Sequence, residues 1–247
     1  MPPVSSKVTV FFDLDGTLFD HHHSLSCGIS AIRQKYPALA SFDLTSLITQ
    51  YNTSLQSAYD EYLQKIITYE ETDYRKIRLF VQGLGLDVPD DAKIAELRDI
   101  YRPAYRGSRR ATPGSIETLV WLRKKGVCLG IITNGQAKDQ LEKATAIGVQ
   151  HLVDYMITSE EAGCCKPDRG IFRLAIDAFG CCLSETYMVG DSVGSDIRGA
   201  LDIGINPILF SPISTDSHLT VSGKTIPIIQ NMSQLVEMIE VSLGMLD

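Results

Sequence analysis

Several features are scarce in this chain, and each absence narrows the class of protein. No apolar run approaches the roughly 18 residues of a membrane-spanning helix, which argues against a membrane protein. The N-terminal stretch, residues 1–7, lacks the charged-then-apolar layout of a secretion signal. Positive charge is in deficit, with 23 Lys and Arg against 30 Asp and Glu and a net charge of −7. We therefore expect no nucleic-acid partner and no membrane partner.

Cysteine is present, but not in the patterns that disulfide frameworks or zinc sites require. The six cysteines include the adjacent pairs Cys164-Cys165 and Cys181-Cys182, and none has Cys-x-x-Cys spacing. With 247 residues, 44% of them hydrophobic, the chain can bury a core without covalent staples. We predict a globular protein of one large or two smaller domains in a reducing compartment, most simply the cytoplasm.

Short apolar runs rich in β-branched and aromatic residues predict the strands of a buried sheet. The candidates are residues 7–12, 127–132, 155–158, 187–189 and 207–210, with 226–229 as a weaker edge strand. Between residues 113 and 210 these runs alternate with helical patterns that end at glycines. This alternation predicts an α/β fold with a doubly wound parallel sheet.

The segment between the first and second predicted strands has helical rather than strand patterns. Its apolar residues recur at helical spacing, as in Leu44, Leu47, Ile48 and Tyr51. We predict a helical domain of residues 20–110, inserted into a Rossmann-like core of residues 1–19 and 111–247. Ligands of open α/β sheets bind outside the carboxyl ends of the strands. An insertion that leaves the end of the first strand would therefore lie over the site as a cap.

Four carboxylates follow two of the predicted strands. Asp13 and Asp15 come after the first strand, and Asp191 and Asp196 come after residues 187–189. Carboxylates at one sheet edge repel one another unless a cation lies among them, and hard oxygen ligands suit Mg²⁺. The hydroxyl of Thr133 and the ammonium of Lys166 also follow strands. Together with backbone N–H groups, they would bind the remaining oxygens of a phosphate group.

These residues belong to four ordered signatures that span most of the chain. The signatures are residues 13–18 (Asp-Leu-Asp-Gly-Thr-Leu), 133–135 (Thr-Asn-Gly), 166–168 (Lys-Pro-Asp) and 190–196 (Gly-Asp-Ser-Val-Gly-Ser-Asp). In this order they resemble a haloacid dehalogenase superfamily hydrolase with a helical cap. Within the superfamily, the chain is most similar to phosphatases of the acylneuraminate phosphatase and small nucleotidase type. The resemblance implies a phosphatase that acts on a small phosphorylated metabolite.

The resemblance also implies a role for each matched residue in catalysis. Asp13 would be the nucleophile that forms an aspartyl-phosphate. Asp15 would protonate the leaving alcohol and then activate water as a base. Thr133, Asn134 through its backbone, and Lys166 would bind the phosphoryl group and stabilise its charge.

The resemblance further implies a Mg²⁺ cofactor at the carboxylates. Asp13, the backbone carbonyl of Asp15, and Asp191 would hold the ion. Asp196 would be a further or water-mediated ligand, or would orient Lys166. This expected set is a hard oxygen site that leaves room for oxygens of the substrate phosphate.

Other enzymes on the same fold, and a protein without catalysis, stay open as alternatives. A sugar phosphomutase would use the same carboxylates, although Thr17 stands where such mutases often carry Val, which favours hydrolysis. A dehalogenase shares the nucleophile but has little need for an acid at Asp15. A catalytically silent binding or regulatory module would usually have lost a nucleophile or a metal ligand, and none of the matched positions is lost here.

Several polar features also have purely structural interpretations. Asp-x-Asp alone is usually a turn, and Asp196 could be a helix N-cap or first-turn acid. We interpret the run at residues 21–23, three consecutive histidines, as a polar hinge segment or a substrate contact. The stretch from Arg98 to Arg110 contains five Arg and one Asp. It is either a solvated helix end or a site for a second anionic group of the substrate.

Overall fold

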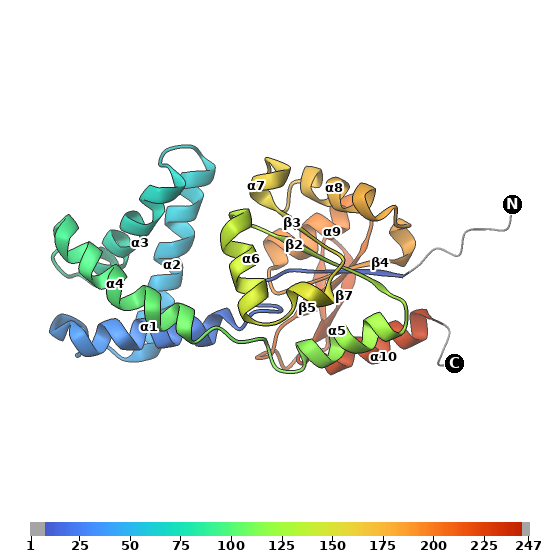
Figure 1. Ribbon diagram of the computed structural model, residues 1–247, viewed down its shortest axis with the longest axis horizontal. Helices are drawn as coiled ribbons and strands as arrows, with labels where there is room; N and C mark the ends of the chain where they lie inside the picture. The colour runs from blue at the N-terminus through green and yellow to red at the C-terminus, as the bar shows by residue number, and fades with distance from the viewer. Residues whose placement is uncertain (1–7, 244–247) are drawn as a thin grey trace, which may run out of the picture. The chain divides into compact units, whose positions relative to one another are not determined.

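The computed structural model describes residues 8–243 of the chain. Residues 1–7, which were considered above for a secretion signal and which include the first residue of the predicted strand 7–12, lie outside the described residues. The chain divides into two compact units: one contains the residues up to Asp20 and from Arg110 onward, and the other is His21–Arg109 (Figure 1). Within residues 8–243, no helix combines the length and apolarity needed to cross a membrane.

The first unit is built on a seven-stranded sheet in the order β3-β2-β1-β4-β5-β7-β6. The strands are β1 (Thr9–Phe12), β2 (Cys128–Thr133), β3 (Tyr155–Thr158), β4 (Thr186–Gly190), β5 (Asn206–Phe210), β6 (His218–Val221) and β7 (Lys224–Ile229). All neighbouring pairs are parallel except β6–β7. The predicted α/β fold with a doubly wound parallel sheet is therefore confirmed, and β1 is an interior strand between β2 and β4.

Helices cover both faces of this sheet (Figure 1). They are α5 (Ser115–Lys124), α6 (Ala137–Ala146), α7 (Ser159–Ala162), α8 (Arg169–Phe179), α9 (Arg198–Ile203) and α10 (Ser233–Ser242). On one face, Phe11 of β1 and Met188 of β4 are buried against Phe172 of α8 and Ala200 of α9. On the other face lie α5 and α10, which are joined where the Thr118 hydroxyl donates to the backbone oxygen of Met232 at 3.1 Å.

The C-terminal part of the sheet differs from its prediction. Residues 226–229 were expected as a weak edge strand, but β7 is parallel to β5 and the edge is the antiparallel strand β6. A tight turn with positive φ at Ser222 (51°) and Gly223 (77°) joins β6 to β7. The edge assignment was wrong because β6 has only four residues, two of them polar, so the hairpin partner that covers β7 was not recognised.

The second unit, His21–Arg109, consists of helices. They are α1 (His21–Lys35), a 3-10 turn (Pro37–Leu39), α2 (Leu44–Leu63), α3 (Tyr69–Gly83) and α4 (Asp91–Gly107). Side-chain caps start three of them: Asp43 accepts from Ser46 N, Thr68 forms a capping box with Glu71, and Asp90 accepts from Lys93 N. Apolar and aromatic side chains fill its interior, where the ring of Tyr51 stacks on Tyr101 with centroids 5.0 Å apart.

Candidate active site

Acidic residues gather where β1 and β4 end. Asp13 directly follows β1 and Asp191 directly follows β4, and these strands are parallel neighbours. The N–H of Asp13 donates to the backbone oxygen of Val189 at 2.9 Å, which continues the ladder by one residue. Asp196 lies in the π-helical turn Val193–Ile197. One carboxylate oxygen from each of the three aspartates lies within 4.8 Å of the others, so the fold brings three of the four predicted carboxylates together.

Two glycines make this crowding sterically feasible. Gly16 has a φ of +89°, and a Cβ at this position would overlap the carboxylate of Asp191. A Cβ on Gly190 would overlap the carboxylate of Asp196 in the same way. Any larger residue at either position would push one carboxylate out of the cluster.

The ammonium of Lys166 lies among the carboxylates and is 4% exposed as a residue. Its Nζ is 2.6 Å from Oδ1 of Asp13 and 2.7 Å from Oδ1 of Asp196, and it donates to the backbone oxygen of Ile132 at 2.6 Å. The contacts with Asp13 and Ile132 are hydrogen bonds, and the contact with Asp196 is an ion pair. The ion pair places Asp196 beside Lys166, and the two roles expected for Asp196, metal ligand or orienting partner of Lys166, stay predictions.

The side chain of Asn134 fixes the loop that carries Lys166. Its Oδ1 accepts from the backbone N–H of Lys166 at 2.8 Å, and its Nδ2 donates to the backbone oxygen of Lys166 at 3.1 Å. Thr133, the last residue of β2, is 1% exposed and lies beside Asn134 at the same sheet edge. The sequence predicted only a backbone role for Asn134, and its side-chain contact with Lys166 was missed.

Burial and crowding alter the protonation of these groups. Burial raises the pKa of Asp13 well above its usual range; the charge of Lys166 opposes this, and the charges of Asp196 and Asp191 add to it. The residue Asp191 is exposed, but its carboxylate end lies against Gly16. Burial of that end and the charge of Asp196 raise the pKa of Asp191 to about 7. Burial alone would lower the pKa of Lys166, but the charges of Asp13 and Asp196 outweigh burial and raise it.

The carboxylate of Asp15 has different partners from the other three. In the part of the chain that the structure describes, the cluster consists of Asp13, Asp191 and Asp196 without Asp15. The carboxylate of Asp15 contacts α6 instead. Nζ of Lys143 lies 2.7 and 2.8 Å from its two oxygens, and Nε2 of Gln140 donates to Oδ2 at 2.8 Å. Neither residue was predicted from the sequence to belong to the site. The one available signal was weak: they lie three residues apart on a helix that begins just after the Thr-Asn-Gly signature.

Comparison with known proteins identifies the family of the chain. Residues 8–204 match the haloacid dehalogenase-like hydrolase family over most of the chain. The chain belongs to the haloacid dehalogenase-like hydrolase family. The expected superfamily membership is thereby confirmed.

Similar proteins of this family include enzymes named as phosphatases. The chain is 31% identical over 235 residues to the glyceraldehyde 3-phosphate phosphatase of Methanothermobacter thermautotrophicus, covering 93% of this chain and 98% of the relative. It is 33% identical over 215 residues to the ribulose-1,5-bisphosphate 5-phosphatase of Halopiger xanaduensis, covering 87% and 88%. The structure of L-2-haloacid dehalogenase from Xanthobacter autotrophicus superposes with a TM-score of 0.71 at 16% identity, covering 95% and 98%, which shows a shared fold.

The other polar features singled out in this hydrolase have local partners. The ring Nδ1 of His21 is 2.9 Å from the hydroxyl of Tyr105 within the helical unit. In the arginine-rich stretch, Arg102 pairs with Asp73, and Arg110 pairs with Asp20 at 2.8 Å. All six cysteines are free thiols. These contacts give His21, Arg102 and Arg110 structural partners, and the substrate roles expected for the two segments stay hypotheses.

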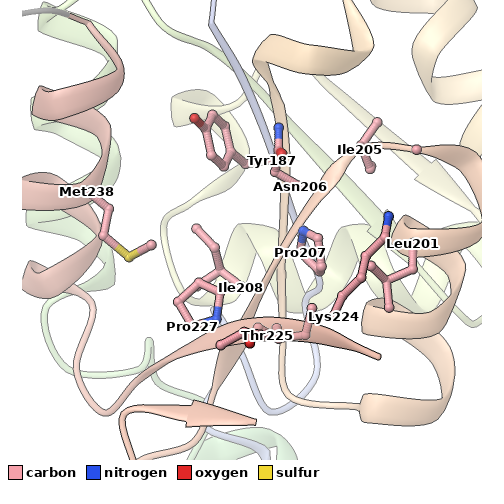
Figure 2. A pocket seen from close by; sticks show the side chains of 12 residues that line it. Tyr187, Leu201, Ile205, Asn206, Pro207, Ile208, Lys224, Thr225, Pro227 and Met238 are labelled. Carbon is pink, nitrogen blue, oxygen red and sulfur yellow. The ribbon is translucent and has the colours of Figure 1, made fainter. Parts of the chain in front are cut away.

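A cavity of about 350 Å³ lies elsewhere in the hydrolase (Figure 2). Its lining includes Tyr187 near the start of β4, Asn206 at the start of β5 and Lys224 at the start of β7. These are the amino ends of parallel strands, whereas Asp13 and Asp191 lie at the carboxyl ends. The cavity is therefore separate from the acidic cluster and brings no carboxylate to its lining.

Proposed function

We propose that this hydrolase is a Mg²⁺-dependent phosphatase that cleaves a small phosphorylated metabolite through an aspartyl-phosphate on Asp13. The observation that carries the proposal is the placement of two nearby carboxylates in different surroundings. Asp13 is buried against Lys166, whereas Asp15 pairs with Lys143 and Gln140 on α6. Two carboxylates with separate partners can take separate roles, one as nucleophile and the other as proton carrier.

The proposed reaction has two steps. A carboxylate oxygen of Asp13 attacks phosphorus, the bond from phosphorus to the substrate oxygen breaks, and Asp15 supplies the proton to the leaving alcohol. Asp15 then takes a proton from water, whose oxygen attacks phosphorus. The bond from phosphorus to Asp13 breaks, which releases inorganic phosphate and restores Asp13. Thr133, the Asn134 backbone and Lys166 hold the phosphoryl oxygens during both steps.

The acidic cluster fits a divalent cation. Its three carboxylates offer hard oxygen atoms within 4.8 Å of one another, which is the donor type that Mg²⁺ prefers. When the three carboxylates are ionised, the single positive charge of Lys166 leaves an excess of negative charge that a divalent cation would offset. Asp13 and Asp191 would hold the ion, with the backbone carbonyl of Asp15 and the side chain of Asp196 as further ligands. Bound Mg²⁺ would withdraw charge from the phosphoryl oxygens.

The substrate class comes from the relatives rather than from the site. The two relatives described above are named for a triose phosphate and a ribulose bisphosphate. We therefore propose a small sugar phosphate as the substrate. The carboxylate of Asp15 favours phosphoryl transfer over dehalogenation, because a dehalogenase has little need for an acid there. The sequence keeps every matched position, which speaks against a silent module.

We further propose that residues 20–110 form a cap for this site. The inserted chain leaves and re-enters the first unit at one place, where Phe19 bridges to Ala111 and Asp20 pairs with Arg110 at 2.8 Å. Insertion at the end of β1 is the position from which a cap could admit substrate and exclude water. For the compartment we propose the cytoplasm, which suits six free thiols.

The test is phosphate release from a panel of phosphomonoesters, with Mg²⁺ and with a chelator. The panel contains triose, pentose and hexose phosphates, nucleoside monophosphates and p-nitrophenyl phosphate. Asp13→Asn is the test variant, and Asp177→Asn, an exposed acid on α8, is the matched control. We expect Mg²⁺-dependent release, lost by about 10⁴-fold or more in Asp13→Asn and unchanged in the control.

Three results would contradict the proposal. Turnover that persists in Asp13→Asn would remove the covalent mechanism. Transfer of phosphate within hexose phosphates without release of free phosphate would identify a mutase. Failure to release phosphate from any ester of the panel, with beryllofluoride also unable to bind at Asp13, would identify a silent module.

A further inference from the structure

Helix α6 carries two side chains that the proposed reaction does not use. Lys143 contacts both oxygens of Asp15, at 2.7 and 2.8 Å, and its side chain is 16% exposed. Its ammonium also lies 5.9 Å from the ring centroid of Phe19, which is fully buried. A carboxylate that accepts hydrogen bonds at both oxygens is restricted in rotation, so Lys143 fixes the orientation of Asp15.

Gln140 lies one turn earlier on the same face of α6 and is 1% exposed. Its Nε2 donates to Oδ2 of Asp15 at 2.8 Å, to the Thr133 hydroxyl, and weakly to the backbone oxygen of Asn134 at 3.3 Å. One buried amide thus joins the proposed proton carrier to the proposed phosphate-binding threonine. A buried amide that bonds to polar groups after two different strands is held in place by both.

The helix that presents these side chains is itself anchored. At its start, the N–H of Ala137 donates to Oε2 of Glu160 at 2.8 Å, and the N–H of Gly135 donates to the Ser159 hydroxyl at 2.8 Å. These bonds tie the loop before α6 to the start of α7. These bonds restrain the start of the helix that carries Gln140 and Lys143, which favours a fixed position for side chains that place another group.

We propose that Lys143 and Gln140 are positioning residues that hold the carboxylate of Asp15 in line with the leaving oxygen, and that Gln140 couples this placement to Thr133. The inference rests on the phosphatase function proposed above. It assigns no proton transfer to either residue. Their effect passes through Asp15 and is largest for substrates whose leaving group needs a proton.

The dependence of the loss in kcat/KM on the leaving group distinguishes positioning of Asp15 from a merely structural role. An alkyl phosphate expels a poor leaving group that needs a proton from Asp15, whereas p-nitrophenolate leaves without one. In Lys143→Met we expect kcat/KM to fall about 10–100-fold for the best alkyl phosphate and less than about threefold for p-nitrophenyl phosphate. Lys143→Arg, which can also contact both carboxylate oxygens, should restore much of the loss.

Matched variants separate positioning from charge and from folding. Lys138→Met removes the same charge from an exposed position on α6 and should change neither substrate. Gln140→Met should also lower kcat/KM more for the alkyl phosphate than for p-nitrophenyl phosphate, although its bond to Thr133 adds a loss that both substrates share. The double variant should lose less than the product of the two single losses. Equal losses on both substrates, or no loss on either, would overturn the inference.

Failure of the inference is distinguishable from failure of the proposed function. If the wild-type protein releases no phosphate, the function fails and the positioning claim is judged by structure. A crystal structure of Lys143→Met should then show the Asp15 carboxylate rotated away from its wild-type position. An unmoved carboxylate in both Lys143→Met and Gln140→Met would overturn the positioning claim on its own.

Discussion

The carboxyl edge of the sheet and the interior of the helical unit are organised in opposite ways. At the sheet edge, charged side chains from distant parts of the chain are buried together, as in the contact of Lys166 with Asp13 and Asp196. Inside the helical unit, apolar and aromatic side chains are buried, and the ion pair of Arg75 with Glu61 lies at the surface. Burying charge costs stability and is retained where chemistry needs it, so the contrast marks the sheet edge as the working part.

The largest effect on stability should come from removing the buried cation. Lys166→Met leaves Asp13 and Asp196 buried without their shared partner, which should lower the free energy of unfolding by about 3–5 kcal/mol near neutral pH in chelator. Urea unfolding of the variant measures this, with Lys124→Met, an exposed lysine on α5, as the control. A loss no larger than that of Lys124→Met would mean that the stability of the buried carboxylates at the sheet edge does not depend on Lys166.

A comparable loss of stability, without a chemical defect, is expected in the helical unit. Leu47 of α2 is fully buried, and Leu47→Ala should lower the free energy of unfolding of that unit by about 2–5 kcal/mol through lost packing and a cavity. Aspartyl-phosphate formation at Asp13 from p-nitrophenyl phosphate should persist below the unfolding temperature. If a folded Leu47→Ala protein formed no aspartyl-phosphate, the chemistry at the sheet edge would depend on the packing of the helical unit, which contradicts the comparison.

The pH dependence of stability should carry the signature of the acidic cluster. The folded pKa of Asp191 is about 7, above the value of about 4 for a carboxyl in an unfolded chain. Between these values the folded state binds more protons, so the metal-free protein becomes less stable as pH rises from about 4 to about 7. The shift of Asp13 has the same direction. Thermal unfolding in chelator should therefore give a lower Tm at about pH 8 than at about pH 5.

Mg²⁺ should reverse this trend, because it competes with protons for the same carboxylates. Millimolar Mg²⁺ should raise the Tm more at about pH 8 than at about pH 5, and Asp191→Asn should reduce the difference. An equal Mg²⁺ effect at both pH values would show that the ion does not bind at Asp13 and Asp191.

The smallest effect is expected from the exposed ion pair of the helical unit. Arg75 contacts both carboxylate oxygens of Glu61, at 2.6 and 2.7 Å, but both side chains are partly exposed. Arg75 lowers the pKa of Glu61 through this hydrogen bonding. Because water screens such a pair, Glu61→Gln should change the free energy of unfolding by less than about 1 kcal/mol. A loss as large as that of Lys166→Met would erase the distinction between buried and surface charge.

The position of each site residue in the fold explains whether the sequence could predict it. Asp13 and Asp191 follow apolar strands directly, and the rule that parallel strands place their carboxyl ends at one edge was enough to bring them together. Lys166 was found through a signature in a loop. Gln140 and Lys143 were missed because a polar pair on a helix is usually a solvated face, and only the tertiary structure shows that this face meets Asp15.

Short or weakly patterned helices and strands also could not be predicted from the sequence. The strand β6 (His218–Val221) alternates polar and apolar residues over four positions, which is too short to distinguish from a loop. After Thr158, a capping box with Glu161 starts the one-turn helix α7, which is too short to show a helical pattern in the sequence. The helix α10 was not predicted at all, although Leu235 and Ile239 form its buried face.

The most direct test of the central claim, that Asp13 and Asp15 have separate roles, uses Asp15→Ala with p-nitrophenyl phosphate. Because this leaving group needs no acid, the first step should proceed, and the second should stall without its base. The account predicts a burst of p-nitrophenolate close to one equivalent per enzyme, with phosphate found by peptide mass spectrometry on Asp13. Steady turnover with no burst and no phosphate on Asp13, or phosphate on another residue, would contradict it.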